Sequence, residues 1–212
     1  MKIAVICASG KEGRLITEEA IKRGHEVTAI VRNKSKIADL KVQHVIEKDI
    51  MSITYDDLSN CDVVVDAFGA WTPETLPQHS TTLNHLCDLL KGKKQRLLVV
   101  GGAGSLFTDK THKQHVFESA GFPTEFVPLA TAMFKAFEEL TKRNDVNWSY
   151  LSPACDFDAN GKRSGKYTLG GDEVILNASG KSYVSYADYA IAIVDEAEKN
   201  KFNQKRFTVV SE

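Results

Sequence analysis

The sequence predicts an α/β protein built on a parallel, doubly wound sheet. Short apolar stretches alternate with helix-like segments along the chain, which is typical of strand–helix–strand units. The strand expected at 62–66 is apolar between its two end carboxylates, as a strand covered by helices on both faces should be. At 212 residues the chain is long enough to bury a large core, and we expect one domain spanning 1–212.

Five strands are predicted in the first half of the chain. An apolar run at 3–6 is followed by a glycine-bearing turn and a helix-like pattern that stops at Gly24. The further strands are rich in apolar and β-branched residues and are expected at 26–31, 44–47, 62–66 and 96–100. We also expect a single helical turn at 56–59 and a helix at about 77–90, where leucines recur on one side.

The second half of the chain is less regular. The predicted elements are a helix at 130–143, a strand at 148–152, a last helix at 186–199 and a final strand at 206–210. Ser185 and Asp188 predict a capping box at the start of the last helix. The stretches at about 105–125 and 154–185 lack clear periodicity or are rich in glycine. We interpret them as excursions above the sheet that form a small substrate lobe.

Composition argues against several classes of partner. The formal net charge is −1, which gives no reason to expect nucleic acid or an anionic membrane as a partner. No apolar run approaches the roughly 20 residues of a membrane span, and no signal-peptide pattern is present, so we expect a cytoplasmic protein. The four cysteines lie far apart without C-x-x-C spacing, which predicts reduced thiols and no metal site.

The turn after the first strand has the context of a dinucleotide fingerprint. Its spacing is G-x-x-G-x-x-G, with Cys7 in place of the first glycine. Small residues let the backbone approach a pyrophosphate, whose charge the free N–H groups at the helix N-terminus would hold, and Gly13 lets the helix pack closely on the strand. The alternative is an ordinary strand-to-helix turn. The cofactor-binding residues expected here are Ala8, Ser9, Gly10, Lys11, Glu12 and Gly13.

Small or functional residues follow other strands at the same edge of the sheet, where doubly wound folds bind ligands. They include Phe68-Gly69 and Gly101-Gly102. Arg32 stands where NAD sites commonly carry an acid, so we predict a contact with the 2′-phosphate and a preference for NADPH over NADH of about 1–3 kcal/mol. The alternative is a solvated basic turn. Asp49 could bond the adenine amino group or cap a helical turn.

In this order and spacing, the stretches 7–13, 48–50, 66–69, 101–105 and 151–154 resemble an atypical short-chain dehydrogenase/reductase. The branch they resemble contains bacterial NADH-flavin reductases and biliverdin reductase B, and the likeness covers nearly the whole chain. It implies a Rossmann-type fold with a pyridine nucleotide across the strand ends and its nicotinamide near Ser105 and Pro153. The cofactor contacts that it implies are Gly10, Gly13, Arg32, Asp49, Ile50, Phe68, Gly69 and Ser105.

The chain lacks the Tyr-x-x-x-Lys pair with which short-chain dehydrogenases exchange a proton with a carbonyl substrate. The nearest spacing is Thr131-x-x-x-Lys135, and a threonine hydroxyl is too weak an acid. Reduction of a flavin, quinone or similar flat acceptor fits better, because such an acceptor stabilises the anion and water can supply the proton. Ser105 is the candidate catalytic residue, as a hydrogen-bond donor; the alternative is a hydroxyl that caps the turn.

Two other function classes stay open. A non-catalytic NADP sensor of the NmrA type would bind the cofactor and would equally lack the Tyr–Lys pair. A nucleotide-sugar epimerase or dehydratase generally uses that pair and needs a sugar-binding domain, so we rank it last. For the reductase we expect a small planar acceptor, with FMN and FAD as candidates, and a monomer or homodimer.

Several other side chains have more than one interpretation. His112 and His115 could form a metal pair or supply an acid, but a solvated polar loop is the better interpretation. Asp156 and Asp158 either face the substrate or cap loop backbone. The aromatic residues that could form a pocket for a planar ligand are Trp71, Phe107, Phe117 and Phe157.

Overall fold

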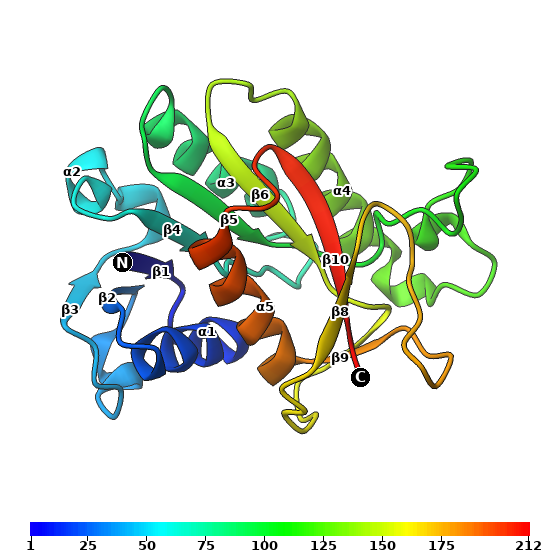
Figure 1. Cartoon of the computed structure of the whole chain (residues 1–212). Helices are drawn as coiled ribbons and strands as arrows, with labels where there is room; N and C mark the ends of the chain where they lie inside the picture. The colour runs from blue at the N-terminus through cyan, green and yellow to red at the C-terminus, as the bar shows by residue number, and fades with distance from the viewer.

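The computed structural model describes all 212 residues and confirms the α/β fold. One sheet has the strand order β3-β2-β1-β4-β5-β6-β10-β8, and Figure 1 shows it as a twisted layer between helices. Every neighbouring pair is parallel except β10 with β8. The strands of this sheet are β1 (Lys2–Ile6), β2 (Glu26–Val31), β3 (His44–Glu47), β4 (Val63–Asp66), β5 (Arg96–Val100), β6 (Asn147–Ser152), β8 (Tyr167–Gly170) and β10 (Lys205–Ser211).

Two pairs of helices cover the two faces of the sheet. The α-helices are α1 (Lys11–Lys22), α2 (Tyr55–Leu58), α3 (Gln78–Leu90), α4 (Val127–Thr141) and α5 (Tyr186–Lys199). Helices α1 and α5 pack together on one face, and α3 packs with α4 on the other (Figure 1). Because successive strand residues point to opposite faces, Ile3 and Val5 join the core under α1 and α5, whereas Ala4 and Ile6 join the core under α3 and α4. None of the helices combines the length and the apolar character needed to cross a bilayer.

The strand order reverses at β1, which pairs with β2 on one side and with β4 on the other. The connection from β1 leads to β2 through α1, and the chain later crosses to β4. At such a switch point the connections diverge, which opens a crevice beyond the carboxyl ends of the strands.

Part of the second excursion extends the sheet instead of lying above it. Strand β8 pairs antiparallel with β10 and forms an edge of the sheet. Only β7 (Asp156–Asp158) and β9 (Tyr183–Ser185) form a separate two-stranded piece. The expectation that the whole of 154–185 lies above the sheet is therefore wrong for β8, because a short edge strand contains too few residues to show a clear period.

The start of α4 and the cap of α5 differ from the expectation. Helix α4 begins at Val127, ahead of the predicted 130, and carries Pro128 in its first turn, where a missing N–H breaks no intrahelical bond. At α5 the Ser185 hydroxyl oxygen accepts a bond from the N–H of Asp188 at 3.1 Å. The N–H of Ser185, however, donates to the Ser211 hydroxyl at 3.2 Å, so only half of the predicted capping box forms.

Candidate functional site

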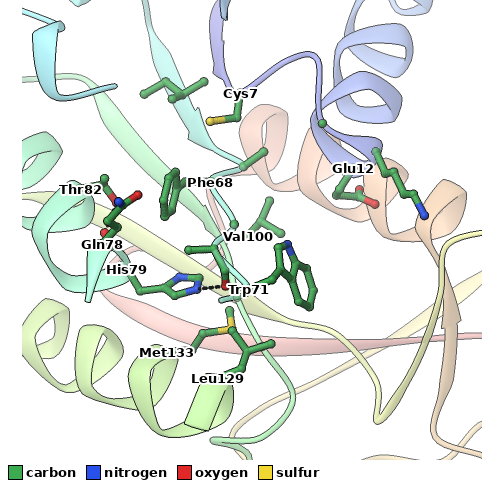
Figure 2. Close-up of a pocket in the computed structure, with 18 of the residues that line it drawn as sticks. Cys7, Glu12, Phe68, Trp71, Gln78, His79, Thr82, Val100, Leu129 and Met133 are labelled. Atoms are coloured by element: carbon green, nitrogen blue, oxygen red, sulfur yellow. Dashed lines mark hydrogen bonds between the residues drawn. The ribbon is translucent and has the colours of Figure 1, made fainter. Parts of the chain in front are cut away.

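The carboxyl ends of β1, β2, β4 and β5 open into one cavity of about 1100 Å³. Most of the residues that the sequence assigned to a cofactor line this cavity, although Ala8 and Gly13 do not. Figure 2 shows side chains from the β1 turn, the β4 turn, α3 and α4 around it. The predicted residues that line the cavity are Ser9, Gly10, Lys11, Glu12, Arg32, Asp49, Ile50, Phe68, Gly69, Gly101, Gly102, Ser105 and Pro153.

The turn after β1 folds around the carbonyl oxygen of Cys7. This oxygen accepts the N–H of Gly10 at 2.8 Å, and a Cβ on Gly13 would lie only 2.4 Å from it. Gly13 therefore lets α1 pack against the turn. Cys7 itself has a φ of 60°, in the left-handed region that favours glycine. The cysteine thus holds the backbone conformation that the glycine of the fingerprint would adopt.

The N-terminus of α1 faces the cavity without a side-chain cap. Gly10 occupies the N-cap position and offers no side chain to the first-turn N–H groups. These groups have no acceptor within the helix, and they lie at the positive end of the helix dipole. The side chain of Lys11 adds a cation beside them at the cavity wall. This end of α1 is suited to bind a phosphate group.

The carboxyl group of Glu12 is buried in the same helical turn. The residue is 8% exposed, and neither carboxyl oxygen has a hydrogen-bond partner. Burial raises the pKa of Glu12 well above its ordinary value of 4.5. The group therefore keeps its proton at pH values where exposed carboxyl groups are ionised.

Basic side chains gather where β2 ends. Arg32 and Lys36 both line the cavity and form no ion pair, whereas the neighbouring Lys34 lies 3.7 Å from Glu47. Unpaired cations at this end of the cavity are suited to bind a further phosphate. After the next strand, β3, Asp49 caps a short 3-10 turn by accepting the N–H of residue 51 at 2.9 Å, which is one of its two predicted roles.

Buried polar groups hold the turn after β4. Asp66 accepts the N–H of Phe68 at 3.0 Å, and burial raises the pKa of Asp66 to about 6. Burial lowers the pKa of His79, and its Nε2–H donates a hydrogen bond to the carbonyl of Ala70 at 3.0 Å (Figure 2). These two bonds keep Phe68 and Gly69 at the cavity wall.

Ser105, at the end of the turn after β5, is buried but does not cap backbone. Its hydroxyl oxygen accepts a bond from Arg206 at 3.2 Å, and its carbonyl accepts from the same guanidinium at 2.6 Å and from His115 at 2.8 Å. The hydroxyl donates to no protein acceptor, and the residue lines the cavity. Arg206 was missed by the sequence analysis because it lies 101 residues further along the chain, on the last strand.

Two buried phenols support the glycine turn after β5. Tyr150 accepts the N–H of Gly102 at 3.2 Å, while Tyr189 accepts the N–H of Gly101 at 3.3 Å and donates to the Leu151 carbonyl at 2.6 Å. Burial raises the pKa of Tyr150 to about 12 and that of Tyr189 well above 10. Both phenols keep their protons at neutral pH and act as structural hydrogen-bonding groups.

Beyond the glycine turn the cavity wall is apolar. Trp71 is 68% exposed and lines the cavity, opposite Leu129 and Met133 of α4 (Figure 2). Phe157 also lines the cavity, as expected. The other apolar lining residues from the segment before α4 and its first turn are Phe122, Pro123, Phe126 and Ala130.

Phe107 and Phe117 do not line this cavity and were wrongly assigned to it. They pack in an aromatic cluster in which the rings of His112 and His115 stack on Phe107 at centroid distances of 4.2 and 4.4 Å. His112 also pairs with Glu173. His115 is thus half-buried in the aromatic cluster, whereas His112 stacks on Phe107 but stays exposed in its loop, as the solvated-loop interpretation expects. Nowhere in the fold do three His, Cys, Asp or Glu side chains gather as metal ligands would.

Asp158 caps loop backbone, which is one of its two predicted roles. Its carboxylate accepts the N–H of Asn160 at 2.8 Å and the hydroxyl of Tyr183 at 3.2 Å. Neither Asp158 nor Asp156 lines the cavity. A substrate in the cavity would therefore not meet these carboxylates.

The polar N-terminal face of α3 was also missed by the sequence analysis. Gln78, His79 and Thr82 line the cavity from the first turns of this helix (Figure 2). A signal was present, since polar residues separated by four positions share one face of a helix, and a helix that follows β4 begins at the edge where the strands end.

The fold and the cavity define a Rossmann-type dinucleotide-binding protein. A sequence profile of the NAD(P)H-binding family matches residues 7–200. The chain therefore belongs to the NAD(P)H-binding family.

Relatives of similar length share this fold. The uncharacterized protein YwnB of Bacillus subtilis is 48% identical over 100% of this chain and 99% of its own. A solved structure from Streptococcus pneumoniae, named a "putative NADH-flavin reductase", is 45% identical with a TM-score of 0.96 over 100% of both chains. A "putative epimerase" from Bacteroides thetaiotaomicron is 34% identical with a TM-score of 0.85, over 99% of this chain and 96% of its own.

Proposed function

We propose that the protein is an NAD(P)H-dependent reductase that passes a hydride to a flavin, a quinone or a similar flat acceptor. The observation that carries the proposal is one cavity that combines an uncapped helix N-terminus, unpaired cations and an apolar wall. Its volume of about 1100 Å³ exceeds the ~300–1000 Å³ of most small-molecule pockets, which leaves room for a dinucleotide and a second flat molecule. The name of the S. pneumoniae relative supports the same reaction class.

Each group of cavity residues has its own role in the proposed reaction. The first-turn N–H groups of α1 hold the diphosphate, and Arg32 holds the 2′-phosphate. A bound nicotinamide cofactor would supply the hydride that reduces the acceptor, and the residues of this chain would hold the two molecules in position. Ser105 donates its free hydroxyl proton in a hydrogen bond to the carboxamide or the acceptor, and Trp71 stacks on the acceptor ring. Water supplies the proton that balances the reduction.

Two structural features favour such an acceptor over a ketone. The buried phenols of Tyr150 and Tyr189 have raised pKa values, which makes them poor proton donors. Their hydroxyl groups are also engaged with the glycine turn. A flavin or quinone needs no protein acid of this kind, because the reduced anion is stable enough to take its proton from water.

The experiment that tests the proposal is NADPH oxidation by the pure protein, with FMN, FAD and a small quinone offered in turn and NADH run alongside. We expect turnover above the protein-free rate with at least one acceptor, and faster turnover with NADPH. Tight cofactor binding without turnover on any acceptor would contradict the reductase and favour a non-catalytic sensor of the NmrA type.

The preference for NADPH can be tested separately at Arg32. In the Arg32→Glu variant the 2′-phosphate would meet a negative charge in place of an unpaired cation. We expect the Kd for NADPH to rise on the order of tenfold to hundredfold, and that for NADH to change by less than about threefold. Titration of nicotinamide fluorescence measures both constants.

Lys142→Glu is the matched control for Arg32→Glu. It makes the same change of charge at an exposed position beyond the C-terminal end of α4, outside the cavity. We expect no change in either Kd. Equal losses of NADPH and NADH affinity in the Arg32 variant would overturn the role assigned to this side chain.

A further inference from the structure

Glu12 is placed where an ionised carboxylate is unfavourable. It is the second residue of α1, between the fingerprint glycines, and both carboxyl oxygens are buried without a hydrogen-bond partner. An acid early in a helix often interacts with the helix dipole or caps an N–H group. Glu12 makes no such bond, and burial without a partner strongly disfavours its charged form.

No cation compensates for the burial of Glu12. The ionisable groups that face it from α5 are the phenols of Tyr186 and Tyr189, and the negative charge of Glu12 raises the pKa of both beyond the effect of their own burial. From the segment after β6, the thiol of Cys155 lines the same cavity. On its own helix, Lys11 lies at the cavity wall but forms no ion pair with Glu12. Figure 2 shows Glu12 beside the turn that carries Cys7.

Ionised Glu12 would repel a diphosphate bound at the N-terminus of α1. The N–H groups that would hold the diphosphate belong to the helical turn that contains Glu12. An ionised carboxylate that is buried in this turn would repel the diphosphate, whereas a neutral carboxylic acid would not. The charge state of Glu12 therefore determines whether this end of α1 accepts an anion.

We propose that Glu12 is a proton-dependent binding residue, so that the dinucleotide binds when the Glu12 carboxyl is protonated and binding takes up a proton wherever free Glu12 is ionised. This inference rests on the proposed dinucleotide site and concerns its regulation by pH. The affinity is constant at low pH and falls as the pH rises through the titration of Glu12. Loss of the proton raises the Kd on the order of tenfold to hundredfold.

The test measures the Kd of NADH and of NADPH from pH 6 to pH 9.5 for the wild type, Glu12→Gln and Glu18→Gln. Gln keeps the size of Glu and is never charged, so we expect Glu12→Gln to bind with an affinity that changes little with pH. Glu18 lies on the same helix, 46% exposed and 3.7 Å from Arg14, so its variant should keep the wild-type pH profile. NADH carries no 2′-phosphate, so its profile excludes titration of that group.

Calorimetry of the wild type provides a second measurement that needs no variant. Binding of NADH in two buffers of different ionisation enthalpy counts the protons taken up, and we expect uptake that grows toward the alkaline end of the range. Parallel pH profiles for the wild type and Glu12→Gln, or no proton uptake, would overturn this inference and leave the reductase standing. Proton-linked binding without turnover on any acceptor would overturn the reductase alone.

Discussion

Cys7 occupies the position of the first glycine in the fingerprint and adopts a φ of 60°. A left-handed conformation costs a residue with a Cβ about 1–2 kcal/mol, and glycine avoids this cost. We therefore expect the Cys7→Gly variant to be more stable than Cys7→Ala by about 1 kcal/mol, since both lack the thiol and only glycine is relaxed in this conformation. Urea unfolding measures the difference.

The Ala variant serves as the reference because it separates the loss of the thiol from the change in backbone strain. Cys7 packs partly against the core under α3 and α4, and both variants lose the contacts of its sulfur. An Ala variant as stable as the Gly variant would show that the turn does not impose the left-handed conformation in solution.

At the scale of elements, the contact between α1 and the turn after β1 depends on Gly13. A Cβ at this position would lie 2.4 Å from the Cys7 carbonyl oxygen and 3.2 Å from the Cα of Ala8, and both are backbone atoms that cannot move independently of the strand. We expect Gly13→Ala to shift α1 away from β1 and to lower the free energy of unfolding by about 2–3 kcal/mol. Thermal and urea unfolding check the value, and nicotinamide fluorescence checks the accompanying loss of NADPH affinity.

Gly121→Ala is the control for this substitution. Gly121 has no atom within 4 Å of the added Cβ and no positive φ. We expect its free energy of unfolding to be unchanged or slightly higher, because alanine restricts the unfolded chain. Equal stability of the two variants would contradict the close packing at Gly13.

At the scale of the whole molecule, the Asp188 carboxylate joins three distant segments. From the N-terminal turn of α5 it accepts the N–H groups of Ser164 and Gly165 at 3.0 and 2.9 Å and the Ser211 hydroxyl at 2.7 Å. Burial would raise the pKa of Asp188, but these bonds hold it below its ordinary value of 3.8. The stability that it contributes is present above pH 3.8 and is lost as the pH falls through the lower pKa of the folded state.

Asp188→Asn should therefore destabilise the protein at pH 7 and much less in acid. Asparagine keeps one acceptor oxygen and turns an NH₂ group toward the other donors, which we expect to cost about 2–4 kcal/mol. The difference from the wild type should shrink as the pH falls below 3.8, because the wild-type carboxyl protonates first in the unfolded chain and at lower pH in the folded one. Urea unfolding at pH 7 and in acid below pH 3.8 measures the two differences in stability. The Asp156→Asn variant is the control, because Asp156 is exposed and we expect no change in stability. A cost that does not change with pH would contradict it.

Elements with strong local signals were predicted well. Strands β2, β3 and β5 and helix α5 have the predicted boundaries, because runs of apolar residues and clear helical spacing depend on neighbours in the chain. Strand β8 is an edge strand whose pairing with β10 depends on a distant segment. Dependence on distant segments also explains why the predicted bond from the Ser185 N–H to the Asp188 carboxylate is absent. Donors from residues 164, 165 and 211 occupy this carboxylate instead.

Local patterns in the chain were enough to predict which residues stand at the strand ends. The glycine-bearing turn, Arg32 and the turn after β5 all meet at the cavity, because parallel strands bring their carboxyl ends to one edge. Three features of the site became visible only in the folded chain. Glu12 is buried without a partner, Arg206 holds Ser105, and Phe107 and Phe117 pack with His115 outside the cavity. The physical reason is that desolvation and hydrogen-bond partners depend on segments that are remote in the chain, whereas periodicity and turn chemistry are local.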